Sequence, residues 1–242
     1  MKDAVVIIPT YNEIENIEAI IRAVFSESRA IHILVVDDSS PDGTSEKVEE
    51  LQTEYLGRLF LKRREEKKGL GTAYILGFKW SLVRSYSYIF EMDADFSHNP
   101  KDLQKLYNAC AIDGADVSIG SRYITGVNVV NWPMSRVLMS YLASKYVRLI
   151  TGMNIQDTTA GFVCYKRHVL ETLDLTKIKF IGYAFQIEMK FKAYIKKFRI
   201  VEIPVIFTDR TRGKSKLSSG IISEAVFGVI SMKMKSLFKR EK

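Results

Sequence analysis

Residues 88–99 read YIFEMDADFSHN, and they join a short apolar run to closely spaced carboxylates. The apolar part, residues 88–92, predicts a buried strand. Asp93 and Asp95 follow it. Because side chains two apart in a strand point to the same face, we expect the two carboxylates to converge as the strand ends. Hard oxygen ligands without a nearby pair of His or Cys favour Mg²⁺ or Mn²⁺ over zinc. The alternative is an ordinary polar strand end.

Strand-like and helix-like segments alternate over the first half of the chain. From residue 4 to residue 120 this alternation predicts an α/β fold with a mostly parallel central sheet flanked by helices. The strand-like runs are rich in β-branched residues, and the segments between them have helical apolar spacing. The expected strands are residues 4–8, 31–36, 59–61, 88–92 and 117–120, and the expected helices are 14–25, 69–83 and one that begins at Pro100.

Polar residues follow three of these strands. They are residues 9–13 (PTYNE), Asp37 with Asp38, and Asp93 with Asp95. Ligands of such sheets bind beyond the carboxyl ends of the strands, so we expect these residues to form one site. Asp37 has an alternative role, which is to cap the turn after it. No glycine-rich phosphate-binding motif follows a strand, so a bound nucleotide would need a metal and basic side chains around its phosphates.

The composition points to an anionic partner. The 242 residues include 36 Lys and Arg against 28 Asp and Glu, which gives a net charge of +8. This excess favours a phosphate-bearing partner or a membrane surface. Cys110 and Cys164 lack metal-type spacing, and they indicate a reducing cytoplasm without a disulfide framework. We expect no signal peptide, because Lys2 and Asp3 lead directly into a strand-like run. We expect no spanning helix, because no apolar run approaches about 18 residues.

The pattern changes after Arg122. Residues 200–207 predict a strand, which Pro204 confines to an edge or a bulge. The sequence predicts a basic loop over residues 209–219. Such a loop is often only solvated, and it lacks the interleaved aromatic residues that nucleic-acid binding would favour.

The C-terminal segment predicts an amphipathic helix. Ile222, Val226, Ile230 and Met234 recur every four residues, and lysines lie near its end. A basic amphipathic helix can lie in a lipid interface. Packing against its own domain is the alternative.

Seven motifs along residues 4–220 resemble those of family 2 glycosyltransferases of the GT-A fold. Within that family they are similar to dolichol- and polyprenol-phosphate mannose synthases. The narrow motifs that favour this branch are NWP (131–133) and the end of FTDRTRGKSKL (207–217). The broader motifs are PTYNE (9–13), VVDDSSPDGT (35–44), KGLG (68–71), DADFSHNP (93–100) and GSRY (120–123).

The resemblance implies a donor site, position by position. The residues that it places against the base and ribose of a sugar nucleotide are Pro9, Tyr11, Glu13, Val36 and Asp38. The residues that it places against the diphosphate and a Mg²⁺ or Mn²⁺ ion are Asp93, Ala94 and Asp95. Some relatives have a metal-binding Gln where this chain has Ser97, a weaker ligand. We expect His98 to be a loop residue.

The resemblance also implies cations for the phosphates. Arg122 matches a phosphate-binding arginine, and Arg210 and Lys216 match a basic loop that closes over the donor. Arg136 and Ser140 match positions that meet the acceptor phosphate. The implied catalytic residues are Asp95, Arg122, Arg210 and Lys216.

The implied reaction is inverting transfer of a hexose from a nucleotide sugar, with GDP-mannose as the expected donor, to a polyprenyl (dolichyl-type) monophosphate. The acceptor is already an anion at pH 7, so it needs no general base. The difficult step is departure of the nucleoside diphosphate, whose charge a metal and nearby cations would stabilise. The alternatives are a glucosyl- or other hexosyltransferase that uses a UDP-sugar, and a non-catalytic nucleotide-sugar-binding module.

These expectations divide the chain. We expect a GT-A domain over residues 1–220, with a nucleotide-sugar half to about residue 122 and an acceptor half over about 123–220. Residues 221–242 would form the C-terminal amphipathic helix. The expected location is the cytoplasm, with peripheral attachment to the membrane surface. Nucleic acid is not an expected partner, and the sequence names no protein partner.

Overall fold

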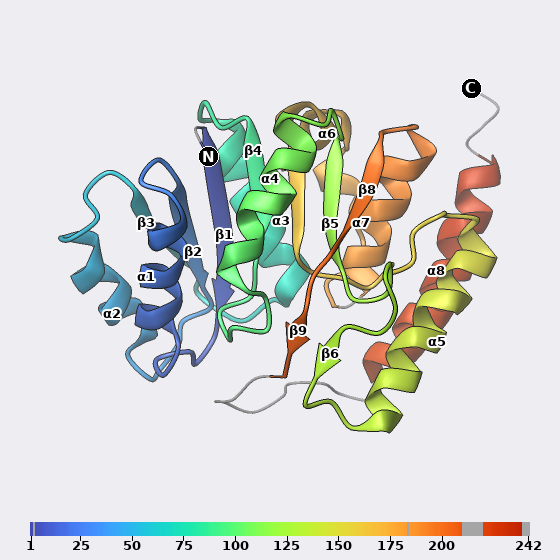
Figure 1. Ribbon diagram of the computed structural model, residues 1–242, viewed down its shortest axis with the longest axis horizontal. Coiled ribbons are helices and arrows are strands. Elements are labelled where there is room, and N and C mark those ends of the chain that lie inside the picture. The colour runs from blue at the N-terminus through green and yellow to red at the C-terminus, as the bar shows by residue number, and fades with distance from the viewer. Residues whose placement is uncertain (2, 183, 210–219, 239–242) are drawn as a thin grey trace.

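A seven-stranded sheet forms the centre of the protein (Figure 1). The computed structural model describes residues 1, 3–182, 184–209 and 220–238. The strand order is β3-β2-β1-β4-β7-β5-β8. The strands are β1 (Ala4–Thr10), β2 (His32–Asp37), β3 (Leu59–Arg63), β4 (Tyr88–Glu91), β5 (Val117–Ser121), β7 (Val163–Lys166) and β8 (Ile200–Pro204). Only β7 runs antiparallel to its neighbours β4 and β5, and the other pairs are parallel. The predicted α/β fold with a mostly parallel sheet is therefore confirmed.

Helices cover both faces of the sheet because each central strand is apolar on both sides. In β1, Val5 and Ile7 pack into one core cluster, and Val6 and Ile8 pack into the other. One layer holds α1 (Ile17–Glu27), α2 (Thr44–Gln52), the short turn η1 (Pro100–Asp102) and α4 (Leu103–Ala111). The other layer holds α3 (Leu70–Leu82), α6 (Arg167–Thr172) and α7 (Ala184–Ile195). Strands buried on both faces read as continuous apolar runs, which is why the sequence revealed them.

Two long helices lie side by side beyond the β8 edge (Figure 1). They are α5 (Met134–Thr151) and α8 (Gly220–Phe238). A small parallel pair, β6 (Val129–Val130) and β9 (Phe207–Thr208), lies apart from the main sheet. None of the described helices is both long enough and apolar enough to cross a membrane.

The second half of the chain completes the same sheet. β7 and β8 both follow Arg122 in sequence, yet they pair with β4 and β5. The division into two halves at residue 122 therefore stays a prediction about roles and does not mark a separate sheet. β8 is an edge strand, as predicted, but it ends at Pro204, and Phe207 belongs to the separate strand β9. At an edge, the missing N–H of proline leaves no neighbouring strand unpaired.

Candidate active site

Three of the polar segments expected to form a site lie at one edge of the sheet. The strands that precede them, β2, β1 and β4, are immediate neighbours and run parallel. Their register aligns Pro9 with Val36 and Thr10 with Asp37. The carboxyl end of β1 lies at the lower edge of the sheet in Figure 1. The structure therefore places these segments together, as the sequence predicted.

Asp37 is a structural carboxylate. It is fully buried, and its two oxygens accept hydrogen bonds from the hydroxyls of Thr10 (2.7 Å), Ser40 (2.6 Å) and Ser45 (2.8 Å). The Ser40 N–H also donates to it, at 2.9 Å. These bonds hold the turn after β2 in place. The turn-capping interpretation of Asp37 is confirmed.

Asp38 is held by an arginine that the sequence did not single out. The Arg64 guanidinium forms an ion pair with the Asp38 carboxylate, and both side chains are largely buried. Arg64 also donates to the Thr72 hydroxyl at 2.6 Å and to the Gly69 carbonyl at 3.3 Å. One side chain thus links the end of β2 to the KGLG turn that opens α3. Arg64 lies among several cations in RREEKK (63–68), so nothing in the sequence distinguished it.

The other expected donor residues surround this edge. The Lys67 ammonium lies 4.5 Å from the centre of the Tyr11 ring. The Glu13 carboxylate accepts a hydrogen bond from the Asn16 amide at 3.0 Å. The Val36 side chain is fully buried in the core, so only its backbone is available to a ligand.

The Asp-x-Asp motif lies in a loop, because β4 ends at Glu91. The alternation of a strand therefore does not set the directions of Asp93 and Asp95, contrary to our expectation. The loop is held by His98, whose Nδ1 accepts the Asp93 N–H at 3.0 Å. The Asp95 carboxylate accepts the Ser97 N–H at 3.1 Å.

His98 is a neutral support for this loop. Its ring stacks on Phe162 with 4.9 Å between the ring centres and meets Phe207 edge-on. Burial lowers the pKa of His98 to about 4, so the imidazole is uncharged at neutral pH. Because Nδ1 accepts a hydrogen bond, its proton is on Nε2. The expected role as a loop residue fits, but no sequence pattern indicated that His98 positions the motif.

The residues present suit a hard cation whose shell a substrate completes. Asp95 and Ser97 are buried, and the Ser97 hydroxyl has no hydrogen-bond partner among the described residues. Within the described part of the chain, no three His, Cys, Asp or Glu side chains are grouped so as to hold a metal alone. Mg²⁺ commonly takes one or two carboxylates and fills its shell with water and substrate phosphates. Asp93, Asp95 and Ser97 match that pattern.

A buried polar network lies at the end of β4, directly before the Asp-x-Asp motif. The Gln186 amide donates to the Glu91 carboxyl at 2.5 Å, and the Lys190 ammonium donates to the Ala160 carbonyl at 2.6 Å. Burial raises the pKa of Glu91 to about 8 and lowers the pKa of Lys190 to about 8. The network joins the end of β4 to α7 and to the turn at Ala160. Gln186 thus makes a contact between α7 and the sheet.

Arg122 is fixed by a carboxylate from a distant turn. Its Nε and Nη2 donate to the two oxygens of Asp157 at 2.7 and 2.6 Å, and Nη2 also donates to the Thr159 hydroxyl at 2.8 Å. Asp157 is fully buried. Although burial alone would raise the pKa of Asp157, the Arg122 guanidinium lowers it below its ordinary value. In the sequence, Asp157 appeared only as part of a polar turn.

The expected acceptor residues form a cluster with aromatic side chains. The Arg136 guanidinium lies 4.0 Å from the Trp132 ring centre and donates to the Asp209 carboxylate at 2.7 Å. The Ser140 hydroxyl accepts the Tyr123 hydroxyl at 2.8 Å. The buried Trp132 Nε1 has no hydrogen-bond partner among the described residues. Arg210 and Lys216, the other two expected cations, lie outside the described residues.

The donor and acceptor parts of this site meet at His98. The His98 ring and the Arg122 guanidinium each lie 5.5 Å from the centre of the Phe207 ring. Carboxylates suited to a cation thus lie close to a fixed arginine. The chemistry of this arrangement is suited to ligands that carry phosphate.

Comparison with known families agrees with this chemistry. A model described as glycosyl transferase family 2 matches residues 5–174. The chain therefore belongs to glycosyl transferase family 2, and the resemblance drawn from its motifs is confirmed.

Similarity to individual proteins points to a narrower group within this family. The chain is 47% identical over 224 residues to the polyprenol monophosphomannose synthase of Mycolicibacterium smegmatis, over 93% of this chain and 84% of that protein. It is 43% identical over 223 residues to the undecaprenyl-phosphate mannosyltransferase of Micrococcus luteus, over 92% and 90%. It is 39% identical over 223 residues to the dolichol-phosphate mannosyltransferase of Pyrococcus furiosus, over 90% of this chain and 60% of that protein.

Solved structures share the fold. Glucosyl-3-phosphoglycerate synthase from Mycobacterium tuberculosis in complex with Mn²⁺ and UDP-glucose superposes with a TM-score of 0.69 at 15% identity. The match covers 96% of this chain and 78% of that one. The complex that also holds phosphoglyceric acid gives a TM-score of 0.66 at 16% identity, again over 96% and 78%. At this level of identity, the likeness concerns the fold, which is the expected GT-A type.

Proposed function

We propose that this chain transfers mannose from GDP-mannose to a polyprenyl monophosphate, with inversion at the anomeric carbon. The observation that carries the proposal is that His98, which accepts the Asp93 N–H, contacts the same Phe207 ring as the Arg122 guanidinium. One part suits the diphosphate of a donor, and the other suits a second phosphate. The names of the relatives at 47% and 43% identity support mannose and a polyprenyl phosphate as the substrates.

The donor would occupy the β1, β2 and β4 edge. Its base and ribose would contact Pro9, Tyr11, Glu13, Asp38 and the Val36 backbone. Ala94 would contact the diphosphate beside the carboxylates. Asp93 and Asp95, with the unpartnered Ser97 hydroxyl, would hold Mg²⁺ or Mn²⁺. When bound, such an ion stabilises the charge of the departing nucleoside diphosphate. The proposed roles of Arg210 and Lys216 in the same step rest on the motif alone.

The acceptor phosphate would lie against the cluster around Trp132. Arg122 and Arg136 supply positive charge, and the unpartnered Trp132 N–H and the Ser140 hydroxyl supply donors. An oxygen of the acceptor phosphate attacks the anomeric carbon and forms the new C–O bond. The bond between the anomeric carbon and the donor diphosphate oxygen breaks, and the nucleoside diphosphate leaves with that electron pair. Because the nucleophile is already an anion, the step needs no proton acceptor. This fits a site whose histidine is neutral and already uses Nδ1 for the loop.

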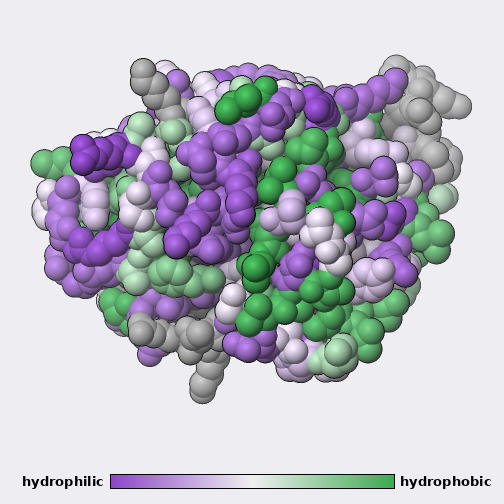
Figure 2. Space-filling view, in the orientation of Figure 1, coloured by the Kyte–Doolittle hydropathy of each residue, from purple (hydrophilic) through white to green (hydrophobic). Residues whose placement is uncertain are grey.

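The lipid part of the acceptor suggests peripheral attachment to a membrane through α5 and α8. Exposed apolar side chains lie along both helices: Leu138, Leu142 and Leu149 on α5, and Phe227, Ile230 and Met234 on α8. Figure 2 shows apolar surface over the α5 region at the right of the molecule. Val229 is buried and Met232 packs against the core, so α8 both packs on its domain and leaves an apolar face uncovered. The Ile222 and Val226 side chains lie outside the described residues.

A donor screen tests the proposal. Purified protein with Mg²⁺ or Mn²⁺ and polyprenyl phosphate is given GDP-mannose, UDP-glucose or UDP-N-acetylglucosamine, and the lipid product is analysed for its sugar and anomeric configuration. We expect mannosyl lipid from GDP-mannose, with inverted configuration. Transfer from a UDP-sugar alone would instead support a different hexosyltransferase. Donor binding without any transfer would support a binding module.

A further inference from the structure

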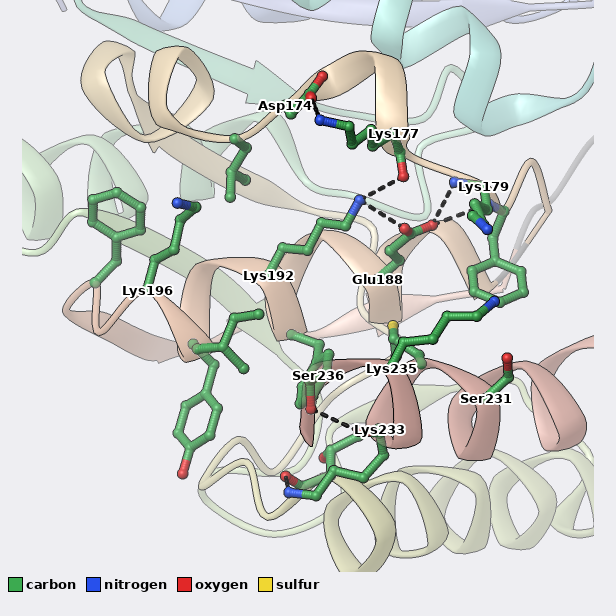
Figure 3. Close-up of a pocket in the computed structure, with 18 of the residues that line it drawn as sticks. Asp174, Lys177, Lys179, Glu188, Lys192, Lys196, Ser231, Lys233, Lys235 and Ser236 are labelled. Carbon is green, nitrogen blue, oxygen red and sulfur yellow. Dashed lines mark hydrogen bonds and ion pairs between the residues drawn. The ribbon is translucent and has the colours of Figure 1, made fainter. Parts of the chain in front are cut away.

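A large cavity lies between α7, α8 and the short turn η2 (Leu175–Lys177) (Figure 3). Its volume is about 1450 Å³. Its lining includes none of the residues assigned above to the donor, the metal or the acceptor. The cavity is therefore a candidate for a second ligand.

The lining is strongly basic. Seven lysines face two carboxylates, a net excess of five positive charges: Lys177, Lys179, Lys192, Lys196, Lys197, Lys233 and Lys235 against Asp174 and Glu188. Both carboxylates already have lysine partners, because Asp174 pairs with Lys177 at 2.6 Å and Glu188 pairs with Lys192 at 2.8 Å. The remaining excess favours an anion.

Two of these lysines approach each other across the cavity. Lys179 precedes α7 and Lys235 lies on α8, and in Figure 3 their side chains reach toward one another beside Glu188. The Lys179 ammonium lowers the pKa of Lys235. Like charges at close range are unfavourable, and an anion between them would remove the repulsion.

The lysines share the lining of the cavity with apolar side chains. They include Phe180, Phe191, Ile195, Phe198 and Met232. Gly228 lets α8 approach closely, since a Cβ atom there would lie 2.5 Å from Cε1 of Phe180. A ligand that fits this lining has an anionic group beside apolar carbon.

Lys235 also lies next to the exposed face of α8. At 3.6 residues per turn, Lys235 falls on the flank between the buried side of Val229 and the exposed side of Phe227 and Ile230. A lipid surface against that exposed face would therefore lie beside the cavity. We propose that the cavity binds the headgroup of an anionic phospholipid, with its phosphate between Lys179 and Lys235 and its first acyl carbons on the apolar wall. This inference rests on the proposed membrane attachment.

Flotation of the full chain with vesicles tests the site. The vesicles are phosphatidylcholine alone or phosphatidylcholine with phosphatidylglycerol. The test variant is Lys179→Gln/Lys235→Gln, and the control is Lys62→Gln/Lys79→Gln, which loses the same charge from β3 and α3. We expect the test variant to bind anionic vesicles at least about tenfold more weakly, since one lysine near an anionic surface contributes about fivefold. The control should change by less than about twofold.

A third variant separates binding from folding. Lys197 adopts a left-handed backbone, with φ of 62°, at the end of α7. Glycine is favoured at such a position, so Lys197→Gly should keep or raise the thermal stability while it weakens binding to anionic vesicles. Soluble short-chain phosphatidylglycerol should compete for the site.

The contrary outcomes are distinct. Equal loss in the two double variants would reduce the effect to diffuse electrostatics and overturn the site. Better competition by inorganic phosphate or by polyglutamate would assign the cavity to a free anion or an acidic protein segment. Loss of mannosyl transfer in detergent by the test variant would place the lysines in the catalytic site. Failure of all vesicle binding, with transfer in detergent intact, would remove this inference and leave the transferase proposal standing.

Discussion

The turn around Asp37, after β2, and the cluster around Arg122 hold their charged groups in different ways. Asp37 accepts hydrogen bonds from three hydroxyls and a backbone N–H, and three of these four donors lie within eight residues of it. Arg122, in contrast, depends on Asp157, 35 residues away, and Arg136 pairs with Asp209 at a separation of 73 residues. The turn around Asp37 is thus built mostly from neutral donors that are near it in the sequence, and the cluster around Arg122 is built from charges that meet only in the folded protein. The second should be more sensitive to the loss of one partner.

The largest effect should come from Asp157→Asn. It leaves the buried Arg122 guanidinium without its counter-charge, and breaking such a pair costs about 3–5 kcal/mol. The matched variant Asp37→Asn removes charge from the other region but leaves neutral partners, so about 1–3 kcal/mol is expected. Urea unfolding of both variants measures the difference. Equal losses would remove the contrast between the regions.

At acid pH, wild type and Asp157→Asn should differ less in their free energy of unfolding. Because the pKa of Asp157 is lower in the folded protein than the ordinary value of 3.8, its stabilising contribution is present above that value. The contribution is lost as the pH falls through the folded-state pKa. Wild type and variant should therefore converge in stability below about pH 4. A gap that stays constant down to pH 2 would contradict the assignment.

A smaller loss is expected from Lys190→Met. The change keeps the apolar stem but removes the hydrogen bond to the Ala160 carbonyl, which should cost about 1–3 kcal/mol. The transfer rate should fall as well, since this bond joins α7 to the turn beside the site. Lys196→Met, at an exposed position directly after the same helix, is the control and should affect both less. Unchanged unfolding and turnover in Lys190→Met would show that the buried network is not needed.

Arg136→Ala tests whether the second region serves the acceptor. A charge-assisted hydrogen bond contributes about 1.5–3 kcal/mol, so the acceptor KM should rise at least about tenfold while donor affinity stays nearly constant. Asp209→Asn is the control, because it removes the same ion pair but keeps the arginine. A purely structural pair would give the same small change in both variants.

The smallest effect on stability is expected from Ser97→Ala. The Ser97 hydroxyl has no partner among the described residues, so its removal should leave the thermal stability of metal-free protein unchanged or slightly higher. The metal concentration for half-maximal transfer should nevertheless rise several-fold. An identical metal titration would exclude Ser97 from the metal site.

Much of the fold could be predicted because its signals are local. The apolar runs of β1 and β2 and the spacing of α1 reflect burial on both faces of the sheet. The antiparallel β7 could not be predicted, because its short run carries no mark of direction or partner. The end of β4 was placed one residue late, since Met92 is as apolar and as buried as the strand before it.

The candidate site likewise contains some residues that could be predicted from the sequence and others that could not. Strand-end residues such as Asp38 and Asp93 follow from the alternation of elements, since parallel strands bring their carboxyl ends together. Arg64, Asp157 and Lys190 were missed because a sequence gives the type of each residue but not its partner. His98 was expected in a loop, yet its hold on the Asp93 N–H depends on stacking against Phe162, 64 positions later in the chain.

The most direct test of the account is transfer of labelled mannose from GDP-mannose to polyprenyl phosphate by wild type and by Asp95→Ala, each with Mg²⁺ and with excess chelator. If the Asp-x-Asp loop holds an ion that stabilises the charge of the departing diphosphate, wild type transfers mannose only with the metal. The variant then shows no transfer above background. Full transfer by Asp95→Ala in the presence of chelator would contradict the central claim.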